Sequence, residues 1–371
     1  MKGLEEIWWR APAGAPRGPL GLALSAGEGL FRGAAAARRA LYRSGLVRPH
    51  RAPVPVVSVG NLTVGGAGKT PVALLVAARL RARGRKVAVL SRGYGARRAD
   101  PRVVSDGERL LLGAAEAGDE PLLLARRLPG TLVLCGPSRA ELSRRAVALG
   151  ADALVLDDGF QHLGLARDLD IVVLDGRDPF GNGHLLPRGP NRELPSALGR
   201  AHLAWISQVD RASPERLALL RTQALAATGH RPVESRHAVE DVLDGLVARS
   251  CGADALAGRR TLLLCALARP DGFRATLLAL GAEVVAERVY RDHHLFSERE
   301  VALALEEAEA KGCEVVATTE KDAVRLPERL ARDTRFRVVR IGAEVVAGGE
   351  VLEELLLRVL RAGAAPREGP G

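Results

Sequence analysis

The chain of 371 residues has few aromatic side chains: twelve Trp, Tyr and Phe residues, or 3% of the total. Proteins that bind single-stranded nucleic acid stack bases on aromatic rings, so this shortage argues against a nucleic-acid partner. Cysteines are also few. The four present lie far apart and form no CxxC pattern. This spacing excludes the common cysteine zinc sites and favours free thiols in a reducing compartment.

Long hydrophobic runs are missing as well. The first twenty residues are interrupted by two glutamates, two arginines and three prolines, so we expect no secretory signal there. The most apolar N-terminal stretch, residues 18–31, is too short to span a bilayer and contains Glu28. We therefore expect a protein that does not cross a membrane.

Positive charge is in excess but localised. Lys and Arg number 54 against 44 Asp and Glu, a net charge of +10. Residues 1–51 carry +6 and residues 79–102 carry +8, so the rest of the chain is slightly acidic. This distribution predicts that an anionic partner contacts the basic segments and not the whole surface.

The N-terminal 51 residues fit a membrane surface better than a protein core. Leu20, Leu24 and Phe31 share one helical face near several arginines, which is typical of an interfacial helix. Glycines and prolines interrupt this stretch and argue against one long helix. Packing of Trp8 and Trp9 on the body of the protein is the alternative to a position among lipid headgroups.

Beyond residue 51, short apolar runs alternate with helical stretches, which predicts βαβ units and a mainly parallel sheet. We expect a membrane-associating segment over 1–51, a P-loop core over 52–230, a hinge or linker over 231–256 and a smaller α/β lid domain over 257–371. The last strand and helix of that domain are candidates to return to the core. The predicted strands are 54–59, 87–90, 131–135, 153–156, 171–174, 203–207, 261–267, 283–286, 315–318 and 336–341.

A glycine-rich loop lies between a predicted strand and a predicted helix over residues 70–83. Glycines bring backbone N–H groups close to a phosphate chain, and the following helix N-terminus favours negative charge. Within this loop Lys69 is suited to the β- and γ-phosphates and the Thr70 hydroxyl to Mg²⁺. The usual P-loop pattern begins with glycine, whereas this chain has Thr63 at that position. The predicted nucleotide-binding residues are Thr63, Val64, Gly65, Gly66, Ala67, Gly68, Lys69 and Thr70.

Two acids, Asp157 and Asp158, end the predicted strand 153–156. P-loop enzymes use an acid at the end of such a strand to hold Mg²⁺. We assign Asp157 to the metal and Asp158 to a catalytic role, orienting a ligand or a base. The sequence therefore predicts an α/β protein with a P-loop NTPase-like core that uses ATP and Mg²⁺.

Several motifs, in order along the chain, resemble those of the tetraacyldisaccharide 4′-kinases of lipid A biosynthesis. They cover most of residues 54–326, and the segment Asp157-Asp158-Gly159-Phe160-Gln161-His162 is the most specific. The others are residues 58–71, 91–95, 118–121, 183–193, 292–294 and 318–323.

The resemblance implies transfer of the ATP γ-phosphoryl group to the 4′-hydroxyl of a tetraacyldisaccharide 1-phosphate, giving lipid IVA. It implies that Asp119 and a histidine, His294 in preference to His293, activate that hydroxyl. It also implies a peripheral protein on the cytoplasmic face of a bacterial inner membrane, and we expect a monomer. The implied substrate-binding residues are Arg92, Tyr94, Arg139, Gln161, Arg192 and Glu193.

One alternative uses the same loop differently. A switch ATPase of the partition or metal-delivery type would couple nucleotide binding to a conformational change and modify no substrate. Such proteins often carry an additional lysine early in the loop, where this chain has Val64. That residue counts against the alternative.

Overall fold

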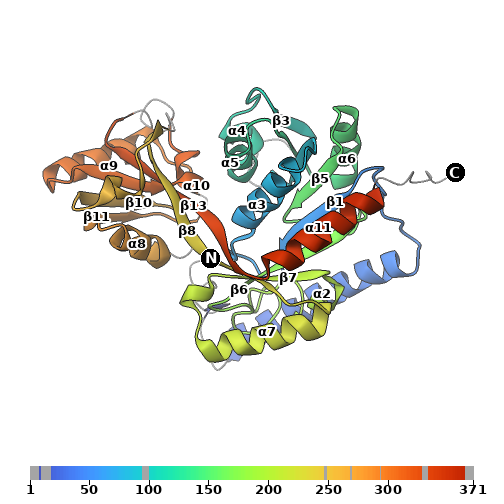
Figure 1. Ribbon diagram of the computed structural model, residues 1–371. Coiled ribbons are helices and arrows are strands. Elements are labelled where there is room, and N and C mark those ends of the chain that lie inside the picture. Colours follow the sequence, from blue (N-terminus) through green and yellow to red (C-terminus); the bar gives the residue numbers. More distant parts are fainter. Residues whose placement is uncertain are drawn as a thin grey trace.

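A computed structural model describes residues 8–9, 18–93, 100–245, 249–267, 270–292, 294–327 and 333–363. Across these ranges one sheet of 13 strands runs through the molecule, and helices cover it. Figure 1 shows two α/β units side by side, joined by two long strands. This is the predicted α/β, mainly parallel architecture.

The first unit holds the centre of the sheet. Its strands lie in the order β3-β4-β2-β5-β1-β6-β7, all parallel except β3, which runs antiparallel to β4. Every residue of β1, β2, β5, β6 and β7 is buried, as expected for parallel strands covered on both faces. These strands are β1 (Val56–Asn61), β2 (Val87–Ser91), β3 (Arg102–Asp106), β4 (Leu132–Cys135), β5 (Ala153–Asp157), β6 (Leu169–Asp175) and β7 (Leu203–Ser207).

Helices pack on both faces of this sheet (Figure 1). One apolar cluster joins the sheet to α3, α5 and α11; separate clusters join it to α6 and to α7. The helices are α3 (Lys69–Arg81), α4 (Ala114–Ala117), α5 (Asp119–Arg127), α6 (Arg139–Ala148), α7 (Pro214–Thr228) and α11 (Gly349–Gly363), with 3₁₀ turns at Pro195–Arg200 and Val209–Arg211.

The second unit is a smaller α/β layer. Its parallel strands β10, β11 and β12 are packed against α8 and α9. The predicted capping box is confirmed at Ser297, whose hydroxyl accepts the Glu300 N–H. The elements are β10 (Arg260–Cys265), α8 (Pro270–Ala279), β11 (Glu283–Val289), α9 (Glu298–Ala310), β12 (Val315–Thr319) and α10 (Glu320–Ala323), preceded by a 3₁₀ turn at Ala253–Leu256.

Two 12-residue strands connect the units. Strand β8 (Val233–Asp244) pairs with β7 at its start and runs antiparallel to β13 (Phe336–Ala347) over most of its length. A two-residue strand, β9 (Arg249–Ser250), also pairs with β8. Much of the stretch that we expected to be a linker is therefore regular sheet. After β13 the chain re-enters the first unit, where α11 buries Leu352, Leu355 and Leu356 in the same cluster as α3.

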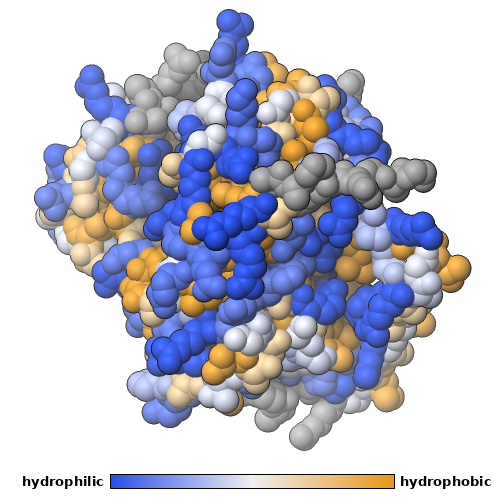
Figure 2. All heavy atoms as spheres, turned by 45° about the vertical axis from the view of Figure 1, so that its right-hand side comes forward, coloured by the Kyte–Doolittle hydropathy of each residue, from blue (hydrophilic) through white to orange (hydrophobic). Residues whose placement is uncertain are grey.

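The N-terminal region corrects one expectation, because α2 (Gly18–Arg43) is a single helix of 26 residues. Pro19 lies in its first turn, where a missing N–H costs little. Within the described residues no helix has the length and apolarity that membrane crossing requires. On the face shown in Figure 2, apolar patches alternate with hydrophilic side chains.

Candidate active site

The glycine-rich loop occupies the carboxyl end of β1 and leads into α3. Gly68 precedes the helix with a φ of +82°, a left-handed conformation that favours glycine. A Cβ at this position would lie 2.9 Å from His237 Nε2, on β8. Position 68 therefore requires glycine for two reasons, the backbone conformation and the close approach of the connecting strand.

Lys69 is held between two side chains at the edge of the sheet. Its Nζ donates to Asn61 Oδ1 over 3.0 Å and lies 3.5 Å from Asp158 Oδ1. Arg192 Nη1 donates to the other oxygen of Asp158 over 2.6 Å. Two cations thus share one carboxylate beside the loop, an arrangement suited to exchange for phosphate oxygens.

The two acids at the end of β5 have opposite electrostatic environments. Burial raises the pKa of Asp157, and the charges of Glu120 and Asp158 raise it further. Burial acts in the same direction on Asp158, but Lys69 and Arg192 outweigh it and hold the pKa of Asp158 below its ordinary value. Asp158 is therefore an anion at neutral pH, whereas Asp157 needs a nearby cation to ionise readily.

Asp157 has the features of a metal ligand. It is 1% exposed, and its Oδ2 accepts from Ser91 Oγ over 3.2 Å. Among the described residues its Oδ1 has no hydrogen-bond partner, which is unusual for a buried carboxylate oxygen. The same residues contain no cluster of three or more His, Cys, Asp or Glu side chains suited to a metal. A Mg²⁺ ion here would therefore also need oxygens from Thr70 and from nucleotide.

The loops after β5 and β6 bring further predicted residues to the same place. Gln161 Nε2 donates to the Asn61 carbonyl over 2.9 Å and to Glu193 Oε1 over 3.2 Å. Glu193 is buried and also accepts from Arg200 at 2.8 Å and from Arg39 of α2 at 3.3 Å. Gln161, Arg192 and Glu193 thus form one network with the P-loop, and α2 contributes to it.

Arg139 begins α6 beside Asp157. Its guanidinium is buried, and it donates to the carbonyls of Gly136 at 2.7 Å and Asp157 at 3.4 Å. Burial lowers the pKa of Arg139 to about 10, so it stays charged at neutral pH. Arg92 is exposed and close enough to oppose the charge of Arg139. Tyr94 lies outside the described residues.

The predicted base, Asp119, and the predicted histidine, His294, each contact a residue other than the one expected for a dyad. Asp119 is the first residue of α5, and its Oδ2 accepts from Arg325 Nη2. His294 Nε2 lies 3.0 Å from Glu300 Oε1, and its ring stacks on Tyr290 with centroids 4.7 Å apart. His293 lies outside the described residues.

Sequence reasoning missed several contributors to this site. Asn61 and Ser91 lie inside motifs already singled out, where adjacency to the P-loop and to Arg92 was the available signal. Arg325 follows the motif at 318–323 but had no signal of its own. His237 lies in the stretch expected to be a linker, so its approach to Gly68 could not be foreseen.

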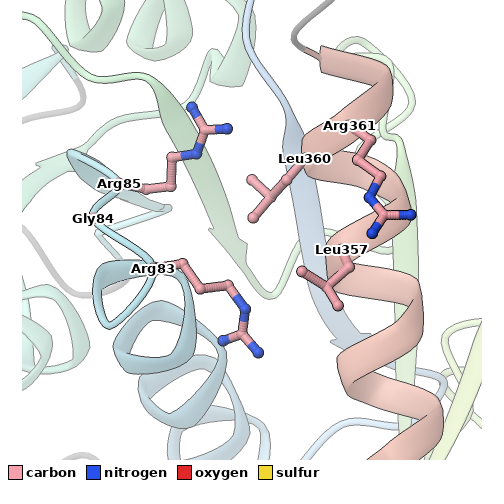
Figure 3. Close-up of a pocket in the computed structure, with 6 residues that line it drawn as sticks. All are labelled: Arg83, Gly84, Arg85, Leu357, Leu360 and Arg361. Carbon is pink, nitrogen blue, oxygen red and sulfur yellow. The ribbon is translucent and has the colours of Figure 1, made fainter.

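A cavity elsewhere carries none of this chemistry. It has a volume of about 400 Å³ and lies between the end of α3 and the end of α11, lined by Arg83, Arg85, Leu357, Leu360 and Arg361 (Figure 3). The P-loop precedes the opposite end of α3. We therefore place the functional site at the P-loop, where the loop, the acids and the arginines converge.

A parallel sheet with a P-loop after one strand and acids after its neighbour defines an ATP-dependent enzyme of the P-loop class. Comparison with known proteins then gives the family. The model of the tetraacyldisaccharide-1-P 4′-kinase family matches residues 20–361. A tetraacyldisaccharide 4′-kinase of Anaeromyxobacter sp. (strain K) is 61% identical, over 100% of this chain and 99% of its own. The chain belongs to the tetraacyldisaccharide-1-P 4′-kinase family.

More distant relatives agree. A tetraacyldisaccharide 4′-kinase of Syntrophus aciditrophicus (strain SB) is 38% identical over 94% of this chain and 95% of its own. The crystal structure of LpxK from Aquifex aeolicus in complex with ATP is 28% identical with a TM-score of 0.73, over 90% of this chain and 97% of that one. The P-loop kinase fold and the predicted family are confirmed, and the switch ATPase is not favoured.

Proposed function

We propose that the chain phosphorylates the 4′-hydroxyl of a tetraacyldisaccharide 1-phosphate with ATP, at the edge of the sheet where Lys69, Asp158 and Arg192 meet. The chain is an ATP-dependent kinase of lipid A biosynthesis by its family. The observation that carries the assignment of the site is the chain of contacts from Lys69 through Asp158 to Arg192, next to the P-loop.

The nucleotide end of the site follows from the P-loop. Backbone N–H groups of residues 63–70 and the ammonium of Lys69 bind the phosphate chain. Thr70 and Asp157 are the residues that would hold Mg²⁺, and the Oδ1 of Asp157, which has no hydrogen-bond partner in the described part of the chain, supports this assignment. When bound, the ion neutralises charge on the transferring phosphoryl group.

The acceptor end uses the remaining side chains. Asp119, with a histidine of the 292–294 motif, takes the proton of the 4′-hydroxyl while the new P–O bond forms and the bond to the leaving ADP oxygen breaks. Arg92, Arg139 and Arg192 supply positive charge for phosphate oxygens. Asp158 keeps Lys69 and Arg192 in place until nucleotide binds.

The exposed face of α2 supports association with a membrane. Leu22 and Leu30 are 74% and 78% exposed, and Leu41 is 45% exposed. Basic residues of the same helix flank them, which suits an anionic surface. Trp8, by contrast, packs on the protein, because its Nε1 donates to the Pro187 carbonyl over 2.9 Å. We place the enzyme at the cytoplasmic face of the inner membrane, where an acylated substrate would reach it.

The activity is tested by incubating the chain with ATP, Mg²⁺ and the tetraacylated disaccharide 1-phosphate. Mass spectrometry should detect the 4′-phosphate. Asp119→Asn should lower kcat by about 10²–10⁴-fold, the usual contribution of a general base, while ATP binding persists. Absence of product from the wild-type chain would contradict the activity, whereas full activity of Asp119→Asn would contradict only the assignment of the base.

The membrane surface is tested by co-sedimentation with vesicles containing anionic lipid. Replacing Leu22, Leu30 and Leu41 by Ser should weaken binding. The matched control replaces Leu219 and Leu225 by Ser, because these leucines of α7 are 57% and 47% exposed on another helix. Equal loss of binding in both variants would refute a specific role for α2.

A further inference from the structure

Helix α5 belongs to the first unit but is tied to the second unit at both ends. At its start, Asp119 binds Arg325. At its end, Arg127 Nη1 donates to Glu320 Oε2 over 2.7 Å and to the Ile341 carbonyl over 3.3 Å. Arg325 and Glu320 both follow β12 in the second unit. We call these two sets of contacts between the units the Asp119 crossing and the Arg127 crossing. Only the Asp119 crossing involves the proposed base.

The crossing at Asp119 is a buried chain of three charged residues. Asp119 is 7% exposed, Arg325 is 5% exposed and Asp322 is fully buried. Arg325 uses Nη2 for Asp119 and Nη1 for Asp322 Oδ1, at 3.2 Å. One guanidinium thus joins two carboxylates that lie on different units. Buried charges of this kind are tolerated only when each is paired.

Local structure fixes the far end of this chain. Asp322 lies in the first turn of α10, and its Oδ2 accepts from Thr319 Oγ1 over 2.8 Å. The same hydroxyl caps the helix by accepting the Asp322 N–H over 3.1 Å. Thr319 therefore orients Asp322, Asp322 orients the guanidinium of Arg325, and the guanidinium holds one oxygen of Asp119. This order of contacts runs from the second unit toward the proposed acceptor site.

We propose that Arg325 is a positioning residue for Asp119, supplied by the second unit to complete the active site of the first. This inference rests on the proposed function, in which Asp119 is the base. Arg325 fixes Oδ2 and thereby sets the orientation of the Asp119 carboxylate toward the acceptor hydroxyl. The guanidinium exchanges no proton in the reaction. Its contribution is geometric, because misplacing a reacting group by about 1 Å costs about 10²-fold in rate.

The first test uses a variant that preserves the buried charge. Replacing Arg325 by Gln alone would strand two carboxylates, and the chain would then be destabilised. The double variant Arg325→Gln/Asp322→Asn removes one positive and one negative charge, so the net charge of the cluster is unchanged. We expect kcat to fall about 10²-fold with little change in KM for ATP, and the Tm to fall less than in Arg325→Gln alone, because one carboxylate loses its partner and not two. A kcat equal to that of the wild type overturns the proposal.

Arg325→Lys tests the geometry directly. A lysine keeps the charge but cannot bind two carboxylates through a planar fork. We expect its kcat to lie between those of the wild type and the double variant, with KM for ATP unchanged. A lysine variant with wild-type kcat contradicts positioning by the guanidinium, because positive charge alone would then be sufficient.

Arg127→Gln is the matched control, because it breaks the other crossing of α5 and leaves Asp119 untouched. We expect its kcat to stay within about twofold of the wild type, whatever happens to its Tm. If it loses as much kcat as the double variant, Arg325 serves only to hold the two units together, and the proposal fails. A fully active Asp119→Asn variant would instead remove the base assignment on which the inference rests.

Discussion

Gly68 offers a sharp test of how closely the connecting strand approaches the P-loop. In Gly68→Ala the new residue must adopt a φ of +82°, and its Cβ would lie 2.9 Å from His237 Nε2 and 3.4 Å from Ser207 Cβ. The left-handed conformation alone costs about 1–2 kcal/mol for a residue with a Cβ. Crowding a packed site by one methyl group adds about 1 kcal/mol or more. We therefore expect a loss of roughly 2–3 kcal/mol in the free energy of unfolding.

The assay is thermal unfolding followed by circular dichroism, together with ATP binding by calorimetry. A loss of this size lowers Tm by roughly 3–4 °C for a chain of 371 residues. The control is Gly66→Ala in the same loop, because no atom lies within 4 Å of a Cβ there and its φ is not positive. Equal Tm values for the two variants would refute the reasoning.

A second variant separates the two costs. Gly68→Ala/His237→Ala removes the ring that the new Cβ would contact but leaves the backbone strain. Its Tm should fall less than the sum of the losses in the two single variants, because the crowding between the two positions is gone. Strict additivity would show that the strand does not press on the loop.

Three further results are expected. Lys69→Ala should lower kcat by about 10²-fold or more, since it removes a cation from the transferring phosphoryl group; a folded variant with wild-type turnover would exclude this role. Asp157→Asn should raise the Mg²⁺ concentration needed for half-maximal rate, and an unchanged Mg²⁺ titration would remove Asp157 from the metal site. Burial lowers the pKa of His237 from 6.5 to about 4, so its contribution to the free energy of unfolding is present above pH 6.5 and is lost as the pH falls toward 4. His237→Asn should therefore flatten the acid decline in the urea midpoint, and an unaltered decline would show that His237 is not responsible.

The parallel core was predictable because each of its strands is a short, continuous apolar run. Strand β8 was not, since its sequence mixes charged and apolar residues and its pairing partner β13 lies about one hundred residues further along the chain. Continuity of α2 was missed because glycines and prolines were given too much weight, whereas in the structure Gly21 and Leu24 are buried within one unbroken helix, so that Leu24 does not face a membrane as expected. Local patterns report burial well but cannot report which distant strand completes a sheet.

The candidate site also combines residues that local patterns predict with contacts between distant segments that they do not predict. Lys69 lies in the glycine-rich loop and Asp158 directly follows strand β5, so their proximity at the same edge of the sheet could be predicted from the sequence. The contact between Asp119 and Arg325 spans 206 positions and two units, and no pattern in either neighbourhood encodes it. His294 was assigned by resemblance, whereas in the structure its neighbours Tyr290, Phe296 and Glu300 all belong to the second unit.

Because aromatic residues are rare in this chain, its intrinsic fluorescence can be assigned to a few tryptophans. Trp205 is fully buried in β7, where its Nε1 donates to Ser235 Oγ over 2.7 Å, so its emission reports the integrity of the sheet. Trp9 lies 3.5 Å from where a Cβ on Gly65 would stand, against the glycine-rich loop that we propose binds the nucleotide phosphates. With only three tryptophans in the chain, intrinsic fluorescence can follow ATP binding near Trp9 and unfolding near Trp205 without any attached dye.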